Sequence, residues 1–455
     1  MDLLNDRLDS KVPAPSVTKG RRRRIVLIGV LVVALIIISA LLGYFIPKNN
    51  SSSSPSNVTI STSPTTPTNT STPSITRNSA KKLFGYWGQS AVGNYVGPLG
   101  LGTRPIPASE QQKGLAYYCD LGYYDVMNLA FLYKFGGGDV HWGLDHSSLG
   151  RYEVDAAGGI SANFEGTPIS TDAFLQVGKD IQYCQSNGIK VVLSIGGDMH
   201  SPYNLIPGDG ARLANIIYNS FLQGNSSARP YGSAILDGVE LDIEKTGPSF
   251  TSEQVILLQT LKQLSPKSIF SAVPQCFLNG VGMDYNTGPV IKSNPELFDY
   301  VIIQYYNNPT CSYPFGFNYP EWTNIFKGSL VIGLAGDDTS AITGGFLNPG
   351  QLQAVLDQVY KDPQFYGISV YDVSSSNPSP SLPSTYSQTL RKALNGERVG
   401  SGYPPQGNFT TEHQWAARCA GTWGYANETC SLDSCKDNWS CADPTKMCFM
   451  FLQQC

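Results

Sequence analysis

Apolar runs recur along the middle of the chain and predict strands that are buried on both faces. Eight such runs are regularly spaced: Leu83–Gln89, Tyr124–Leu132, Lys190–Gly196, Ala234–Glu244, Ile269–Pro274, Tyr300–Tyr306, Leu330–Gly336 and Gly367–Asp372. Most are continuous rather than alternating, as in parallel strands covered by helices. Helical periodicity precedes four of them: Thr171–Ser186, Gly210–Leu222, Ser252–Leu264 and Asn348–Lys361. Eight β/α units in about 300 residues predict an α/β fold, a (β/α)8 TIM barrel over residues 81–395.

A different pattern precedes this domain. Residues 25–45 are 21 almost entirely apolar residues without a charge, which is long enough to span a bilayer as a helix. Arg21–Arg24 come directly before them, at the end of a polar tail, residues 1–24. The positive-inside rule then predicts a transmembrane signal-anchor and a single-pass type II membrane protein with an exported body. A cleaved signal peptide and a secreted protein are the alternative, but the apolar core of such peptides is normally shorter.

Two low-complexity segments separate the span, the barrel and a C-terminal module. Residues 46–80 are rich in Ser, Thr and Pro and cannot bury a core, so they predict an extended, O-glycosylated stalk. Residues 396–412 contain a Gly/Pro-rich linker, and residues 413–455 hold six of the 10 cysteines. An even number at this density predicts a module with three disulfides, whose pairing is open. Its aromatic residues fit either a sugar-binding platform or a small core: Trp415, Trp423, Tyr425 and Trp439.

Charge narrows the range of partners. The 455 residues carry a net charge of −4, but residues 1–49 hold 8 of the 31 basic and only 3 of the 35 acidic residues. The remainder carries 23 basic and 32 acidic residues, which argues against nucleic acid as a partner. The cysteine content suits an exported protein, as do N-x-[ST] sequons beginning at Asn57, Asn69, Asn225, Asn408, Asn427 and Asn438.

Three carboxylates at every second position end the fourth predicted strand. Because alternate side chains of a strand share a face, Glu240, Asp242 and Glu244 are expected to lie together, with Asp237 out of step. Acids on a buried face are costly unless they share protons or bind something, and their repulsion raises at least one pKa, which suits a general acid. An exposed edge strand with solvated acids is the alternative, but the branched residues alongside favour a central strand.

This stretch resembles the catalytic signature of glycoside hydrolase family 18, D-G-x-D-x-D-x-E. Asp237, Gly238, Asp242 and Glu244 match it, whereas Glu240 stands where the family usually has Asp. Other stretches, in order along the chain, are similar to the plant and fungal class III chitinases of that family: FGYWGQS (84–90), YDVMNLAFLYKFGGG (124–138), IKVVLSIGGD (189–198) and QYYNNPTC (304–311). The resemblance implies an endo-acting chitinase without a cofactor, which hydrolyses β-1,4-linked N-acetylglucosamine in chitin or related glycans.

The resemblance also implies roles for individual residues. Family 18 uses the acetamido oxygen of the substrate as the nucleophile. Glu244 would be the acid and then the base, and Asp242 would hold the acetamido N–H. Glu240 would share a proton with Asp242, and Asp237 would be structural. Tyr306 would donate its hydroxyl to the acetamido oxygen.

Further residues of the site come from the same resemblance. The substrate-binding set is Tyr86, Phe131, Gln304, Asn307 and Tyr371. Gly196 and Gly197 form the S-x-G-G element with Ser194 and are expected to be structural. Tyr371 stands where a tryptophan usually floors the critical subsite, and tyrosine covers less area. For each of these aromatic residues a core position is the alternative.

Four cysteines lie in the predicted barrel. Cys276 follows the fifth strand and Cys311 the sixth, so neighbouring loops bring them within reach of a bridge. The resemblance implies the pairs Cys276–Cys311 and Cys119–Cys184; four free thiols are the alternative. No metal site is expected, because the histidines form no ligand spacing: His141, His146, His200 and His413.

Two rival functions remain open. Family 18 scaffolds include lectins and inhibitors without catalysis, which typically lose the acid that is retained here as Glu244. An endo-β-N-acetylglucosaminidase acting on N-glycans shares the mechanism and differs in the length of the cleft.

Overall fold

The computed structural model describes residues 77, 79–91, 111–278, 284–341, 343–378 and 385–400, and the backbone of five strands between 415 and 452. The predicted cytosolic tail and membrane span, residues 1–24 and 25–45, lie outside the described residues, as does most of the stalk. Within the described part of the chain, no helix combines the length and apolar character needed to cross a bilayer.

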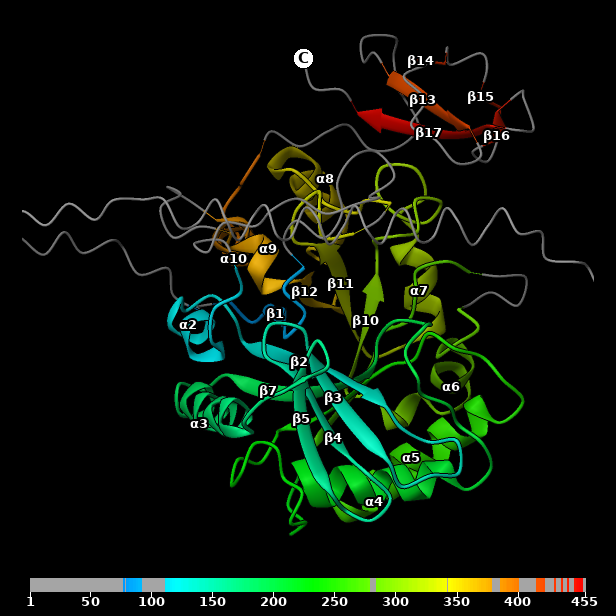
Figure 1. The fold of residues 1–455 in the computed structure, drawn as a ribbon. Helices are drawn as coiled ribbons and strands as arrows, with labels where there is room; N and C mark the ends of the chain where they lie inside the picture. The colour runs from blue at the N-terminus through cyan, green and yellow to red at the C-terminus, as the bar shows by residue number, and fades with distance from the viewer. Residues whose placement is uncertain are drawn as a thin grey trace, which may run out of the picture. The chain divides into compact units, whose positions relative to one another are not determined.

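Eight parallel strands close into a barrel (Figure 1). They are β1 (Lys82–Trp87), β2 (Val126–Lys134), β7 (Lys190–Gly196), β8 (Gly238–Asp242), β9 (Ile269–Ala272), β10 (Tyr300–Gln304), β11 (Ser329–Ala335) and β12 (Phe365–Tyr371). Pairing of β1 with both β12 and β2 completes the circle. Each strand coincides with one of the apolar runs, so the predicted TIM barrel is confirmed. The fourth strand is shorter than expected, since Glu244 lies beyond the ladder that ends at Asp242.

Helices cover the outside of the barrel (Figure 1). They are α2 (Leu115–Asp120), α3 (Asp172–Ser186), α4 (Asp209–Phe221), α5 (Phe250–Leu264), α6 (Gly288–Ser293), the 3-10 helix η1 (Pro295–Leu297), α7 (Tyr319–Ile325), α8 (Pro349–Val359), α9 (Val373–Ser376) and α10 (Tyr386–Leu394). The four helices predicted from periodicity are α3, α4, α5 and α8. Asn348 explains why α8 begins where it does: its side chain accepts from the Gln351 backbone N–H at 3.0 Å, completing a capping box.

Strand residues alternate between two apolar layers. Val239 and Leu241 of β8 are fully buried and belong to the large cluster that also contains Leu257 and Leu258 of α5. A second, smaller cluster takes its residues from the opposite faces of the barrel strands and so lies inside: Phe84, Val126, Val192, Val273, Tyr300, Ile302 and Val331. Glu240 and Asp242 share this inward face, because they alternate with Val239 and Leu241.

An antiparallel extension leaves the barrel after β2 and was not predicted. Its strands are β3 (Trp142–His146), β4 (Gly150–Val154), β5 (Ile160–Phe164) and β6 (Thr167–Pro168), and β3 pairs with β2. Each strand is at most five residues long, and Gly150 has a positive φ of 96° at the turn into β4. This extension supplies one wall of the cavity described below.

Two disulfides tie the barrel, Cys119–Cys184 and Cys276–Cys311. They are the two pairs that the resemblance implied. The first joins α2 to α3, and the second joins the segments that follow β9 and β10.

The C-terminal segment contains a separate antiparallel sheet in the order β14–β13–β17–β16–β15. The strands are β13 (Trp415–Gly421), β14 (Thr429–Cys430), β15 (Cys435–Lys436), β16 (Ser440–Cys441) and β17 (Lys446–Leu452). In its ladder Cys419 is the partner of Cys448, and Cys435 is the partner of Cys441. The three disulfides expected in this module stay a prediction, and their pairing stays open.

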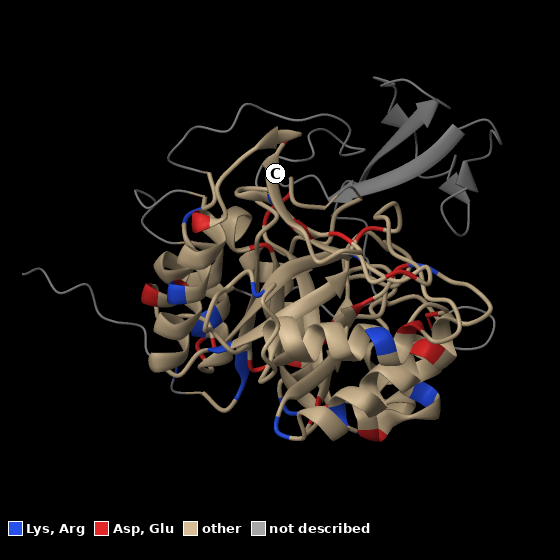
Figure 2. Cartoon of the chain, turned by 60° about the horizontal axis from the view of Figure 1, so that its bottom comes forward, with Lys and Arg blue, Asp and Glu red and all other residues tan. Residues whose placement is uncertain are grey.

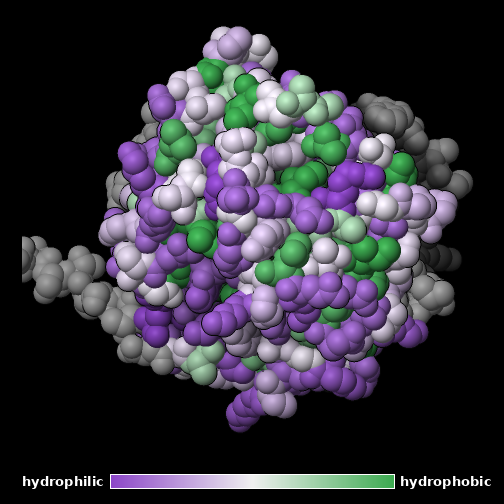
Figure 3. All heavy atoms as spheres, turned by 90° about the horizontal axis from the view of Figure 1, so that it is seen from below, coloured by the Kyte–Doolittle hydropathy of each residue, from purple (hydrophilic) through white to green (hydrophobic). Residues whose placement is uncertain are grey.

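The described surface is mixed in character. Lys, Arg, Asp and Glu residues are scattered over the helices and loops rather than gathered by sign (Figure 2). On the face drawn in Figure 3, hydrophobic residues form small separate groups among hydrophilic ones. Ligands usually bind in concave sites with a few convergent polar groups, so the cavity of the barrel is the leading candidate.

Candidate active site

A cavity of about 460 Å³ opens at the end of the barrel where the parallel strands terminate. Its lining comes from seven of the eight barrel strands or the loops after them, and from the β3–β4 hairpin: Gln89, Phe131, Tyr133, Asp145, Arg151, Gly197, Asp198, His200, Ser201, Pro202, Asp242, Glu244, Tyr306, Asn307, Ser340 and Tyr371. This is the end at which TIM-barrel enzymes carry their catalytic residues.

The three carboxylates of the fourth barrel strand lie at different depths. Asp242 and Glu244 line the cavity, whereas Glu240 is fully buried beneath it. Glu244 is half-buried and follows the last residue of β8 by two positions. The predicted common face therefore runs from the barrel interior at Glu240 to the cavity at Glu244.

Glu240 is surrounded by hydrogen-bond donors from four other barrel strands. Its Oε1 accepts from the Tyr86 hydroxyl at 2.7 Å and from the Ser194 hydroxyl at 3.0 Å. Its Oε2 accepts from Nδ2 of Asn128 at 2.9 Å and from the Ser271 hydroxyl at 3.5 Å. Removing a carboxylate from water costs free energy, and these hydrogen bonds offset part of that cost.

The recorded hydrogen bonds of Glu240 lead to other barrel strands, and the shortest is the one from the Tyr86 hydroxyl at 2.7 Å. The sharing of a proton between Glu240 and Asp242 stays a prediction. Tyr86, expected to bind substrate, is 2 % exposed and does not border the cavity. Its hydroxyl is used by Glu240, which acts on Asp242 through its charge.

A single amide links the two carboxylates that face the cavity. Nε2 of Gln304, at the end of β10, donates to Oδ1 of Asp242 at 2.9 Å and lies 3.5 Å from Oε1 of Glu244. It also donates to the Val273 carbonyl at 3.1 Å. Gln304 is 3 % exposed and is not part of the cavity lining, so the structure places it behind the two acids. The substrate contact expected of Gln304 stays a prediction.

Aromatic rings and one amide line the cavity around these acids. The rings of Tyr306 and Tyr371 are stacked with their centroids 6.1 Å apart. Phe131, a residue of β2, also lines the cavity. Asn307 also borders the cavity, and its Oδ1 accepts from the Thr343 backbone N–H at 3.2 Å. Four residues of the predicted site are thus brought to the cavity beside the acids.

Two glycines at the end of β7 keep space for this lining. Gly196 has a φ of 105°, and a Cβ there would lie 2.2 Å from the Asp242 carbonyl oxygen. Gly197 has a φ of 83°, and its Cβ would lie 2.9 Å from the Phe131 ring. Both therefore need glycine for conformation and for space.

Asp237 lies at the other end of β8, away from the cavity. Its Oδ2 accepts from the Val191 backbone N–H at 3.0 Å and from Nε2 of Gln185 at 2.8 Å. Its Oδ1 forms an ion pair with Lys190 at 2.8 Å. These contacts fit the structural role expected from its position out of step with the three acids.

Burial raises the pKa values of all three acids. It raises the pKa of Glu240 to about 7, against the lowering effect of its hydrogen bonds. It raises the pKa of Glu244 to about 7, with added repulsion from Asp198 and Asp284. The pKa of Asp242 is raised well above its usual range by burial and then by the charges of Glu244 and Glu240. A carboxyl that holds its proton near neutral pH is suited to general acid catalysis.

The described side chains offer no obvious metal site. Within that part of the chain, no three or more His, Cys, Asp or Glu side chains are grouped so as to hold a metal ion.

Comparison with known proteins places the chain in a family. No family model matches it. It is 33% identical over 270 residues to the acidic endochitinase of Phaseolus angularis, which covers 57% of this chain and 80% of that protein. The chain belongs to the family 18 chitinases. The resemblance drawn from its acidic strand is confirmed.

Solved structures agree on the fold of this family 18 chain and differ in activity. A chitinase from Ipomoea carnea is 26% identical with a TM-score of 0.51, covering 68% of this chain and 98% of its own. A xylanase and α-amylase inhibitor protein is also 26% identical with a TM-score of 0.51, covering 70% and 99%. The same scaffold therefore occurs in a chitinase and in an inhibitor protein, and the residues of the cavity must decide between hydrolysis and binding.

Four residues of the cavity lining were not predicted as site residues from the sequence. Asp145 and Arg151 come from the unpredicted hairpin, where Nε of Arg151 lies 2.9 Å from Oδ2 of Asp145. Asp198 and His200 follow β7, two and four residues after Gly196, and form an exposed pair at 2.9 Å. Asp198 and His200 could have been predicted, because they come just after a barrel strand. The sequence held no such signal for Asp145 and Arg151.

The raised pKa of Glu244 predicts a pH dependence for hydrolysis in which this residue is the acid. An acid catalyst works only while protonated, so kcat/KM for a soluble chitin oligomer should fall as the pH rises through about 7. The apparent value belongs to the interacting pair of Asp242 and Glu244. Rates measured from pH 4.5 to 9 at constant ionic strength test this. A kcat/KM that stays constant up to pH 9 would contradict it.

Proposed function

We propose that this protein is an endo-acting chitinase that cleaves β-1,4-linked N-acetylglucosamine with retention of configuration. The observation that carries the proposal is the pair Asp242 and Glu244, held by one amide of Gln304 in a cavity lined with aromatic side chains. The described relatives called acidic endochitinases support the substrate class and the endo action.

The reaction needs one proton donor and no enzymatic nucleophile. Glu244 protonates the glycosidic oxygen, and that C–O bond breaks as the acetamido oxygen bonds to the anomeric carbon. The product is an oxazolinium ion. Glu244, now a carboxylate, takes a proton from water as the water oxygen bonds to the anomeric carbon, and the bond between that carbon and the acetamido oxygen breaks to restore the acetamido group. Two inversions at one carbon leave the β configuration.

Asp242 and Tyr306 serve the acetamido group. Asp242 accepts a hydrogen bond from its N–H and, when ionised, balances the positive charge of the oxazolinium ion. Tyr306 directs its hydroxyl to the acetamido oxygen, which keeps that oxygen near the anomeric carbon. Stacked Tyr306 and Tyr371 rings form an apolar surface for a sugar face.

The product anomer tests the mechanism. The full chain is incubated with chitin hexamer, and the first product is followed by proton NMR before mutarotation. We expect the β-anomer, because the acetamido group and then water attack in turn. An α-anomer as the first product would rule out substrate assistance.

A binding protein without catalysis is the second candidate. The observation in its favour is that an inhibitor protein and a chitinase match this chain equally well, each with 26% sequence identity and a TM-score of 0.51. Incubation with chitin oligomers and, in parallel, a high-mannose glycopeptide, read by mass spectrometry, separates three outcomes. Cleaved chitin supports the first proposal, cleaved glycopeptide supports an endo-β-N-acetylglucosaminidase, and binding without cleavage supports a lectin or inhibitor.

The proposed reaction takes place outside the cytosol, on the surface of the cell or in a secretory compartment. Two disulfides in the barrel and the apolar segment at residues 25–45 support this location. The anchor would hold the catalytic barrel near the membrane through the stalk at residues 46–80. Fractionation of membranes with and without residues 1–45 tests the anchor.

A further inference from the structure

The backbone of Glu244 lies outside the ladder that holds the rest of its strand. β8 ends at Asp242, so strand pairing does not fix the peptide that carries the proton donor. The backbone N–H of Glu244 donates instead to the hydroxyl of Tyr203, at 2.9 Å. Tyr203 belongs to the loop after β7, whose residues Asp198 and His200 border the cavity.

The ring of Tyr203 is held by two neighbouring side chains. Phe135 stacks on one face, with centroids 5.0 Å apart and planes inclined by 19°, and the two residues also form a backbone bridge. Nζ of Lys245 lies 4.6 Å from the ring centroid. Only 2 % of Tyr203 is exposed. The hydroxyl that meets Glu244 is thus carried by a ring with little freedom to move.

Lys245 also binds the loop directly. Its Nζ donates to the carbonyl oxygen of Ser201 and, at 3.2 Å, to that of Tyr203. Lys245 follows Glu244 in the chain, so its side chain binds the same loop that accepts the hydrogen bond of the Glu244 N–H. Two successive residues are therefore fastened to one loop, one by its backbone and one by its side chain.

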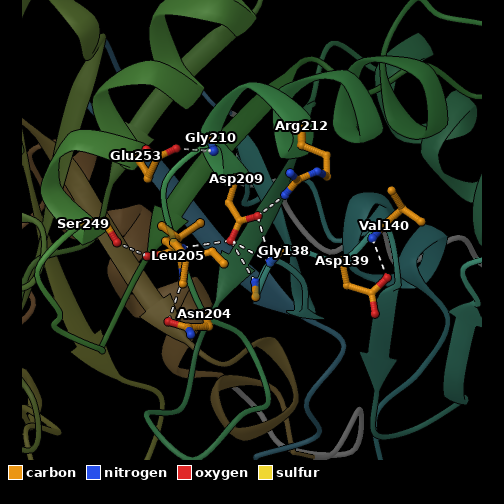
Figure 4. Close-up of polar contacts among 12 residues, drawn as sticks. Gly138, Asp139, Val140, Asn204, Leu205, Asp209, Gly210, Arg212, Ser249 and Glu253 are labelled. Atoms are coloured by element: carbon orange, nitrogen blue, oxygen red, sulfur yellow. Dashed lines mark hydrogen bonds and ion pairs between the residues drawn. The ribbon is translucent and has the colours of Figure 1, made fainter.

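The continuation of this loop is anchored to the body of the barrel (Figure 4). The Asn204 backbone N–H donates to the Phe135 carbonyl at 3.0 Å, and the Ser249 hydroxyl donates to the Leu205 carbonyl at 2.5 Å. Asp209, 1 % exposed, accepts from the Ile206 N–H at 2.9 Å. Its carboxylate also accepts from the backbone N–H groups of Gly137 and Gly138. The loop that carries Tyr203 is thus a fixed support.

We propose that Tyr203, which is held by its contacts with Phe135 and Lys245, is a positioning residue. Its hydroxyl fixes the backbone of Glu244 and thereby orients the Glu244 carboxyl toward the scissile oxygen. The inference rests on the proposed function, because it assumes that Glu244 is the proton donor. It assigns to the loop after β7 a task in the reaction beyond lining the cavity. A displacement of the donor by a fraction of an ångström lowers the rate of proton transfer without removing any substrate contact.

Removal of one oxygen tests the inference. Tyr203→Phe keeps the ring that contacts Phe135 and Lys245 but leaves the Glu244 N–H without its acceptor. In the full chain, kcat for chitin hexamer should fall about tenfold, equivalent to about 1.4 kcal/mol, with KM unchanged. Lys245→Met, which removes the two bonds to the loop, should lower kcat in the same direction.

Tyr118 provides a matched control. It is 1 % exposed in α2, and its hydroxyl accepts the Lys113 backbone N–H at 3.0 Å, away from the cavity. Tyr118→Phe therefore removes the same kind of hydrogen bond and should leave kcat unchanged. Equal kcat values for the two variants would overturn the inference, as would a fall in both in parallel with thermal stability.

A second measurement does not depend on hydrolysis. The hydrogen-exchange rate of the Glu244 amide, followed by NMR, should rise at least tenfold in Tyr203→Phe and stay unchanged in Tyr118→Phe. If the wild-type protein fails to cleave chitin, the proposed function falls, and the exchange rates still decide whether Tyr203 fixes Glu244. An unchanged exchange rate in Tyr203→Phe would overturn the positioning role even in an active enzyme.

Discussion

Glu244→Gln is expected to lower kcat for chitin hexamer by about a thousandfold while leaving oligomer affinity nearly unchanged. General acid catalysis contributes factors of about 10² to 10⁴, and glutamine cannot supply the proton. Its volume is almost that of glutamate, so the contacts of the cavity remain. The amide can still meet Gln304 through its oxygen. Steady-state kinetics and calorimetric titration with the hexamer give the two quantities.

A glutamate outside the cavity supplies the control for this result. Glu296 is exposed in η1, far along the chain from the carboxylates of β8, and Glu296→Gln makes the same chemical change. It should leave kcat at the wild-type level. If Glu244→Gln retained the wild-type rate, another group would have to donate the proton, and Asp242 would be the first alternative.

Asp242→Asn is expected to lower kcat by about a hundredfold with little change in KM. Burial and the neighbouring acids raise the pKa of Asp242, which favours the neutral form of this residue in the free protein. Asparagine matches that neutral state, and substrate should bind equally well. It cannot ionise when the oxazolinium ion forms, however, and charge stabilisation of this kind is worth factors of about 10² to 10³.

The split between kcat and KM distinguishes this explanation from a loss of structure. Circular dichroism and the melting temperature should match those of the wild-type protein, since the Gln304 amide keeps an acceptor at Oδ1. A variant that loses affinity and keeps kcat would assign Asp242 to substrate binding alone.

Asn307→Ala should raise KM and leave kcat unchanged, because Asn307 lines the cavity but carries no charge.

The barrel could be read from the sequence because its information is local. Each parallel strand is covered on both faces, so its residues are apolar in succession, and the run at 330–336 shows this as clearly as the strand Ser329–Ala335 that it predicts. The hairpin of β3 and β4 escaped prediction because its strands are short and partly exposed. Arg151 and Glu153 alternate with buried Tyr152 there, a weak signal over five residues.

The acidic site was predicted in its residues and only partly in its contacts. Period-two spacing places Glu240, Asp242 and Glu244 on one face, but it says nothing of what stands opposite. The partners of Glu240 come from β1, β2, β7 and β9, as far as 154 residues away in sequence. Tyr203 gave no signal for a similar reason, since its partner Glu244 lies 41 residues further on.

The surroundings of Glu240 restrict how this position can change during evolution. Four donors are spaced for a glutamate, and an aspartate would withdraw its oxygens by about 1.5 Å and leave several donors unsatisfied. Reversion to the residue usual in the family is therefore epistatic: its cost depends on which side chains occupy positions 86, 128, 194 and 271. A lineage that carries glutamate here would be expected to keep or exchange these positions together.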